Sequence, residues 1–120
     1  MFDRVGKNIL STLSDYISDF LKSLADPVKI DLIKLLKNQK KNSKEIQEEL
    51  EISQAHASQK VNDLIKAGII SSEKIDNIKY YTLKNYEILK FLSYSASFVL
   101  DLEKKRLENL RKMDDLEKVF

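Results

Sequence analysis

The sequence predicts a mostly α (α+β) fold, in which four helices are followed by a β-hairpin and a long final helix in the order α-α-α-α-β-β-α. Three observations predict this order. Apolar residues recur at helical spacing through most of the 120 residues. Two runs rich in β-branched and aromatic residues meet at Asp76-Asn77. Both glycines and the only proline lie where a helix is expected to begin or end.

Two helices are expected in the first third of the chain. Apolar residues recur at helical spacing from Ile9 to Leu24, which predicts one broad apolar stripe on a helix of about five turns. Asp26-Pro27 ends this helix and begins the next, because aspartate caps free backbone amides and proline fits the first helical position. The second helix is strongly apolar, so we expect it to be buried. The polar run over residues 38–42 ends it.

The next two helices are short and closely spaced. Asn42 and the glutamate three residues later have the spacing of a capping box, which predicts a helix over residues 43–50. Ser53 is the next cap and opens a helix over residues 54–67, which Gly68 closes at a position suited to a left-handed backbone. A short helix, a tight turn and a second helix form the helix-turn-helix arrangement, whose second helix enters the major groove of DNA.

The remaining elements are a hairpin and one long helix. Strands over residues 69–75 and 78–83 flank Asp76-Asn77, and asparagine tolerates the positive φ of a tight turn. A hairpin in this place would be the wing of a winged helix-turn-helix, lying on the DNA backbone or in the minor groove. From Tyr86 the helical pattern continues for roughly thirty residues without proline or glycine. A chain of this size cannot bury the whole stripe of such a helix by itself, so pairing with a second copy is expected.

We therefore expect a single winged helix domain over residues 1–120. Its parts would be an N-terminal dimerisation helix (1–24), a winged helix-turn-helix core (25–84) and a C-terminal coiled-coil dimerisation helix (85–120). The predicted dimer interface consists of the apolar residues of the first and last helices: Ile9, Leu13, Tyr16, Ile17, Phe20, Leu92, Ala96, Val99, Leu100, Leu107, Leu110 and Met113.

Composition excludes several classes of function. The chain has no cysteine, which excludes disulfides, thiolate metal sites and cysteine nucleophiles, and its single histidine, His56, is too few for a site of several imidazoles. No nucleophile–base pair or phosphate-binding glycine loop is recognisable, so we expect neither an enzyme nor a cofactor. No apolar run is long enough to span a membrane, and the first residues do not form a signal peptide. A cytoplasmic protein without a membrane partner is expected.

Charge is segregated along the chain. Residues 22–44 carry seven lysines against two aspartates, and four glutamates follow within residues 45–51. This pattern suits a protein with one face for a polyanion and another face for something else. Solvated helix faces in a lysine-rich protein would give the same pattern, so charge alone does not decide between these interpretations.

Three segments resemble one known family in the right order. Leu24-Ala-Asp-Pro-Val-Lys-Ile-Asp-Leu-Ile-Lys-Leu-Leu36 resembles the opening of ArsR-family regulators, residues 53–70 are similar to their recognition helix, and Lys79-Tyr-Tyr-Thr-Leu83 is similar to the end of their wing. The resemblance covers residues 23–83. It implies a transcription regulator that binds double-stranded DNA as a homodimer through its first and last helices, with the recognition helix reading DNA from its outer face.

With Ala57, Val61 and Leu64 as the inner face of the recognition helix, its outer face offers groups that suit DNA. Glutamine and asparagine make bidentate contacts to adenine, serine and histidine reach base edges or phosphates, and a helix N-terminus with lysines favours a phosphate. Each lysine could equally be an ordinary solvated side chain. The predicted DNA contacts are Lys41, Ser43 and Lys44; Ser53, Gln54, His56, Ser58, Gln59, Lys60, Asn62 and Lys66; and, in the wing, Lys74, Asn77 and Lys79.

The chain departs from the family pattern in three places. The family's metal-sensing cysteines of the short helix and the histidine ligands of the last helix are both missing, so we expect no metal site. The sequence does not identify a small-molecule effector. Glu51 stands where the family commonly has glycine, which costs about 1 kcal/mol if positive φ is needed. The last helix is longer than usual and is similar to that of small archaeal regulators that pair through an antiparallel coiled coil. The lysine- and isoleucine-rich composition also suits an archaeon or an AT-rich genome.

Two alternatives to a sequence-specific regulator stay open. A winged helix can serve as a protein-interaction module, and the acidic short helix favours that reading. An abundant, chromatin-like DNA binder would also show the polar and basic surface predicted for the recognition helix.

Overall fold

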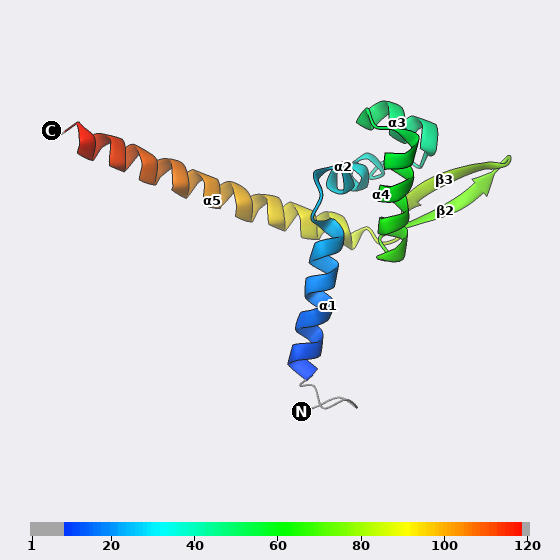
Figure 1. Ribbon diagram of the computed structural model, residues 1–120, viewed down its shortest axis with the longest axis horizontal. Coiled ribbons are helices and arrows are strands. Elements are labelled where there is room, and N and C mark those ends of the chain that lie inside the picture. Colours follow the sequence, from blue (N-terminus) through cyan, green and yellow to red (C-terminus); the bar gives the residue numbers. More distant parts are fainter. Residues whose placement is uncertain (1–8, 119–120) are drawn as a thin grey trace. The chain divides into compact units, whose positions relative to one another are not determined.

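The structure, a computed structural model, describes residues 9–118. Its elements are α1 (Ile9–Leu24), α2 (Pro27–Leu35), β1 (Lys41–Asn42), α3 (Ser43–Leu50), α4 (Gln54–Lys66), β2 (Ile70–Ile75), β3 (Ile78–Leu83) and α5 (Glu87–Glu117) (Figure 1). Four helices, a hairpin and a long final helix confirm the predicted winged-helix fold class. Residues up to Tyr86 form one compact unit, and residues from Glu87 onward form a second. No described helix combines the length and apolarity needed to cross a membrane.

The junction between α1 and α2 is built by its local sequence, as predicted. Asp26 is the N-cap of α2, and its carboxylate accepts a hydrogen bond from the backbone amide of Val28 at 2.8 Å. Pro27 occupies the first helical turn, where a missing amide proton costs nothing. Together these two residues end one helix and begin the next within three positions.

A short strand that the sequence did not predict lies before α3. Strand β1 pairs with β3, with Lys41 opposite Tyr81 and Asn42 opposite Tyr80, so the sheet order is β1-β3-β2. A strand of two residues is too short to show an alternating pattern of side chains. It is defined instead by pairing with β3, which lies far along the chain. Asn42 also caps α3, and it exchanges hydrogen bonds with Glu45 in the predicted capping box.

The core of the first unit is made where the helices meet the sheet. Helix α2 and its C-cap supply Leu32, Ile33 and Leu36, so α2 is buried along one side, whereas Ile30 is exposed because it lies on the other side of the helix. The other three large side chains that are fully buried come from α3, α4 and β2: Ile46, Leu64 and Ile70. Burial of apolar surface stabilises a fold by about 25 cal/mol per Å². These six buried side chains therefore hold the helix-turn-helix on the sheet.

Three turns use left-handed backbone. Gly68 (φ 76°) ends α4, and Asp76 (φ 51°) and Asn77 (φ 65°) form the hairpin turn; the predicted roles of Gly68 and Asn77 are confirmed. Glu51 at the C-cap of α3 has φ 54° and ψ 48°, so the position does require a left-handed residue and a glutamate occupies it. Such a conformation costs a residue with a Cβ about 1 kcal/mol relative to glycine.

Candidate nucleic-acid interface

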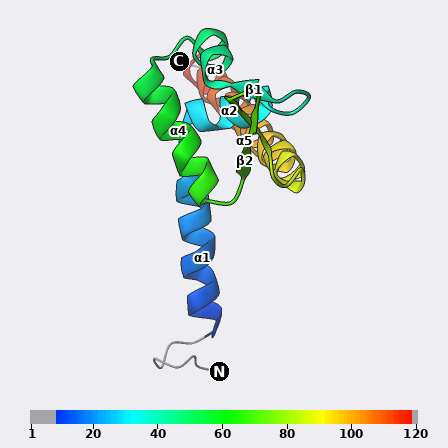
Figure 2. The same ribbon diagram turned by 90° about the vertical axis from the view of Figure 1, so that its right-hand side faces the viewer.

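Helix α4 is fixed at its start by a cap and along one side by the core. The Ser53 hydroxyl accepts a hydrogen bond from the backbone amide of His56 at 3.1 Å. Ala57, Val61 and Leu64 are buried, which confirms the predicted inner face of this helix. Figure 2 shows α4 at the edge of the first unit, with α2 and the sheet on one side of it only. The other side of α4 is therefore left to solvent.

The exposed side of α4 carries five of the seven side chains of this helix that the sequence assigned to DNA. His56 is half-buried and lies beside them. The fully exposed members of the set are Gln54, Ser58, Gln59, Asn62 and Lys66. These side chains offer amide, hydroxyl and ammonium groups and no large apolar group, so this surface suits hydrogen bonding to base edges and phosphates.

Two lysines predicted to meet phosphate have partners within the protein. The Lys60 ammonium donates to the carboxylate of Asp26, and the Lys41 ammonium lies 3.1 Å from a carboxylate oxygen of Glu49. Lys60 therefore points toward α2 rather than toward the exposed side of α4. The Lys60 hydrogen bond, with help from the Val28 amide, holds the pKa of Asp26 below its usual value, although burial opposes the shift.

The start of α3 keeps one exposed cation. Lys44 is exposed, whereas the Ser43 hydroxyl is half-buried and accepts a hydrogen bond from the Gln47 amide at 3.0 Å. The capping box formed by Asn42 and Glu45 uses part of the free backbone at this helix end. Of the three residues predicted here, Lys44 is thus the one best placed for a phosphate.

The wing presents a pair of lysines directly across its two strands. Lys74 is opposite Lys79 in the antiparallel register, and directly opposite residues share one face of a sheet. Like charges in this arrangement repel each other, and an anion between them offsets the repulsion. Alternation along the strands puts both lysines on the same face as the buried pair Ile70 and Leu83. Asn77 lies exposed at the tip of the turn.

Apolar side chains are exposed on the two helices predicted to form the dimer. In α1, Leu13, Tyr16 and Ile17 are exposed and Phe20 is half-buried, whereas the side chain of Ile9 lies outside the described residues. In α5, Leu92 is half-buried and the remaining predicted residues are exposed: Ala96, Val99, Leu100, Leu107, Leu110 and Met113. Exposed apolar surface of this extent is typical of association sites.

In the distal half of α5 the apolar residues follow an unexpected spacing. Leu107, Leu110, Met113 and Leu116 recur every three residues. A straight seam on a helix needs an average spacing between 3.5 and 3.6 residues, so a three-residue spacing winds around the helix.

Two residues that were not predicted from the sequence join α4 to α2 by an ion pair. Lys29 of α2 and Asp63 of α4 form an ion pair with 3.1 Å between its charged atoms. The available signal was the alternation of charge three residues apart in each helix, Asp26 with Lys29 and Lys60 with Asp63. Elsewhere in the described chain, no group of three histidine or carboxylate side chains is close enough to hold a metal ion.

A helix-turn-helix followed by a two-stranded wing defines a winged helix protein. Residues 26–72, which include the helix-turn-helix and the start of β2, match the family model described as bacterial regulatory protein, arsR family. A search of the curated proteins finds no match.

Solved structures share this fold. Rv0081 of M. tuberculosis has a TM-score of 0.73 and 20% identity, covering 84% of this chain and 99% of that chain. The transcriptional regulator HlyU of Vibrio vulnificus has a TM-score of 0.62 and 26% identity, covering 74% and 93%. The homodimeric winged helix-turn-helix DNA-binding domain of Mb0332 from Mycobacterium bovis, a possible ArsR-family regulator, has a TM-score of 0.69 and 17% identity, covering 84% and 94%.

Proposed function

We propose that this chain is a sequence-specific, double-stranded DNA-binding transcription regulator, with α4 in the major groove and the wing on the backbone or in the minor groove. The observation that carries the proposal is the exposed side of α4 in an ArsR-family helix-turn-helix domain. Gln54, Gln59 and Asn62 offer side-chain amides there, and such amides read adenine by paired hydrogen bonds. An enzyme role has no support, because the matched family is one of regulatory proteins.

Phosphate contacts would come from lysines on three elements. Lys44 at the start of α3, Lys66 on α4, and Lys74 with Lys79 on the wing are exposed. In the described residues none of these four forms an ion pair. Their charge is therefore available to displace counterions from DNA, whereas the charges of Lys41 and Lys60 are already matched by carboxylates.

We further propose that the regulator acts as a homodimer through α1 and α5. The support is the exposed apolar surface of both helices, together with the homodimeric state stated for the Mb0332 domain. Two recognition helices in such a dimer should be roughly 34–36 Å apart, the distance of one DNA turn. Sensing through cysteine-bound metal is outside this proposal, because the chain has no cysteine.

The test is a titration of the purified full chain into labelled duplexes at several salt concentrations. One duplex carries the promoter of its own gene and the other has a random sequence. We expect log affinity to fall steeply with log salt, by about 0.9 for each phosphate contacted. Lys66→Ala should lower this slope by about that amount, whereas the matched variant Lys105→Ala should leave it unchanged because Lys105 lies on α5 and pairs with Asp101.

The outcomes separate the three functions. A steep slope with a preference for the promoter supports the regulator, and a steep slope without preference supports a chromatin-like binder. Absence of binding at low salt contradicts the proposal and favours a protein-interaction module. The exposed glutamates Glu48, Glu49 and Glu51 at the end of α3 are the observation that favours this second candidate.

A further inference from the structure

Two ion pairs join α4 to α2 along one seam. In the first, Asp26 at the N-cap of α2 accepts from the Lys60 ammonium of α4. Their side chains are only 21% and 16% exposed, so solvent screens this pair weakly. The Asp26 carboxylate also accepts a hydrogen bond from the Val28 amide, which orients the carboxylate from within its own helix.

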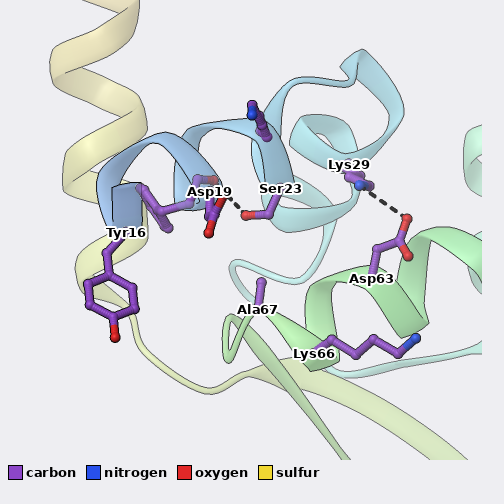
Figure 3. A pocket seen from close by; sticks show the side chains of 9 residues that line it. Tyr16, Asp19, Ser23, Lys29, Asp63, Lys66 and Ala67 are labelled. Atoms are coloured by element: carbon purple, nitrogen blue, oxygen red, sulfur yellow. Dashed lines mark hydrogen bonds and ion pairs between the residues drawn. The ribbon is translucent and has the colours of Figure 1, made fainter. Parts of the chain in front are cut away.

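The second pair lies one helical turn further along both helices. Lys29 of α2 and Asp63 of α4 are 3.1 Å apart, with side chains 11% and 39% exposed (Figure 3). Both residues line an open hollow of about 700 Å³ between α1, α2 and α4. Lys66 lines the same hollow, and Figure 3 shows it on the next turn of α4 beside Asp63.

The two pairs have opposite polarity. In the first, α2 supplies the acid and α4 the base; in the second, α2 supplies the base and α4 the acid. We infer that this alternation is a register lock, which fixes α4 against α2 and so sets the position of the exposed side of α4. This inference rests on the proposed function for its effect on DNA, and the residues of the lock act by positioning and not by touching DNA.

The apolar contacts of α4 already disfavour a shifted register, because a shift by one turn would place Lys60 or Gln54 at the buried position of Ala57. Charge opposes the shift further. A shift of α4 by one turn would bring Asp63 opposite Asp26 and Lys66 opposite Lys29, two repulsive pairs in place of two attractive ones. The opposite shift would bring Lys60 opposite Lys29. Like charges brought together in a partly buried site disfavour both alternatives.

A shifted register would change which base pairs the side chains of α4 face. One turn moves each side chain of the recognition helix by roughly 4.5–5.4 Å along its axis, more than the 3.4 Å between base pairs. Gln54, Gln59 and Asn62 would then face the wrong bases. Phosphate contacts tolerate such a shift better, because the backbone is repetitive. The lock should therefore affect the preference between sequences more than overall affinity.

The test reverses the second pair in the full-length chain, because Asp26 also caps α2 and cannot be changed cleanly. The variants are Lys29→Asp, Asp63→Lys and the double reversal, which keeps the net charge. The readouts are the ratio of affinities for promoter and random duplex, and amide hydrogen exchange of α4. Lys105→Asp, alone and with Asp101→Lys, is the control, because that pair lies exposed on α5.

We expect each single variant to lower the affinity ratio by about fivefold or more and to speed exchange in α4, since paired residues couple. The double reversal restores an attractive pair, so hydrogen exchange in α4 should return to within about twofold of the natural chain, whereas a merely disrupted fold would not recover. It also gives both pairs the same polarity, so charge no longer opposes a one-turn shift, and the affinity ratio should stay below that of the natural chain. The Lys105 control should change neither readout. Unchanged single variants, or a double reversal that restores the affinity ratio together with the exchange, would overturn the register lock.

The exchange readout separates this inference from the proposed function. If the natural chain binds no duplex at low salt, the regulator proposal fails, but loss of α4 protection in the single variants and its recovery in the double reversal would still support the lock. If the chain binds promoter DNA and exchange is unaffected by every variant, the lock fails and the regulator proposal stands.

Discussion

The winged helix unit and α5 use the same kinds of side chain in opposite ways. In the core of the first unit, leucines such as Leu32 and Leu64 are buried, and the ion pair of Asp26 with Lys60 is partly buried. In α5, apolar side chains from Val99 onward are exposed, and ion pairs such as Asp101 with Lys105 are 67% and 70% exposed. Exposed pairs contribute little to stability, and exposed apolar surface contributes nothing until something covers it. The first unit has a buried core of its own, whereas α5 leaves most of its apolar side chains exposed.

Removal of α5 should have the largest effect of the changes that test this comparison. We expect a chain ending at Lys90 to remain folded as a monomer and to lose the dimer. Its affinity for promoter duplex should fall by on the order of a hundredfold, because the two half-sites are no longer bound together. Sedimentation gives the oligomeric state and circular dichroism at 222 nm the fold. A truncated chain that stayed dimeric would place the interface on the first unit alone.

Matched leucine truncations in the two regions should differ in what they destabilise. Leu64→Ala leaves a cavity at a fully buried site and should cost about 3 kcal/mol in the free energy of unfolding. Leu110→Ala lies on an exposed site and should leave the unfolding of the monomer unchanged while weakening dimerisation. Urea unfolding of both full-length variants at a protein concentration low enough to keep them monomeric, and sedimentation at higher concentration, measure the two effects. Equal losses of unfolding free energy from both variants would contradict the division between the regions.

A smaller effect concerns the strained turn of the first unit. Glu51→Gly should raise the free energy of unfolding by about 1 kcal/mol, because glycine adopts φ 54° without a steric penalty. A glycine in the exposed middle of α5, such as Lys104→Gly, should instead lower helix stability by about the same amount. Thermal unfolding of both variants is the measurement. A destabilised Glu51→Gly protein would mean that the glutamate side chain offsets its backbone cost.

The smallest effect is a pH dependence of the stability that the partly buried pair of Asp26 with Lys60 contributes. The pKa of Asp26 is lowered in the folded chain below the usual 3.8, so the folded state favours the ionised form. Its contribution is therefore complete above the unfolded pKa and is lost as pH falls through the lower folded pKa. Asp26→Asn, which keeps an N-cap, should be less stable than the natural chain at pH 6, and the difference should shrink below pH values of about 4.

Local features of the fold were predictable from sequence because their causes are local. Asp26, Asn42 and Ser53 cap helices through hydrogen bonds to residues two or three positions away, and a pattern of that length can be read directly. The left-handed positions Gly68 and Asn77 were predictable for the same reason. These caps and turns, together with the helical spacing, were enough to give the order of the elements.

The features that escaped prediction depend on distant partners. Strand β1 has only two residues and is defined by pairing with Tyr80 and Tyr81. Lys60 was assigned to phosphate from its place in the recognition helix, but its partner Asp26 lies 34 residues earlier in the chain. The direction of a long flexible side chain depends on which charge the fold brings near it, and sequence spacing does not contain that information.

The three-residue spacing in distal α5 has a geometric consequence. A row of side chains three residues apart is inclined by roughly 45° to the helix axis. A second helix packed on the row from Leu107 to Leu116 therefore crosses α5 obliquely and touches it over a short length. In the proposed dimer such a crossing would act as a pivot, since it would join two copies at one point and leave their relative rotation weakly fixed. A dimer joined in this way could adapt to half-sites of slightly different spacing without rebuilding its interface.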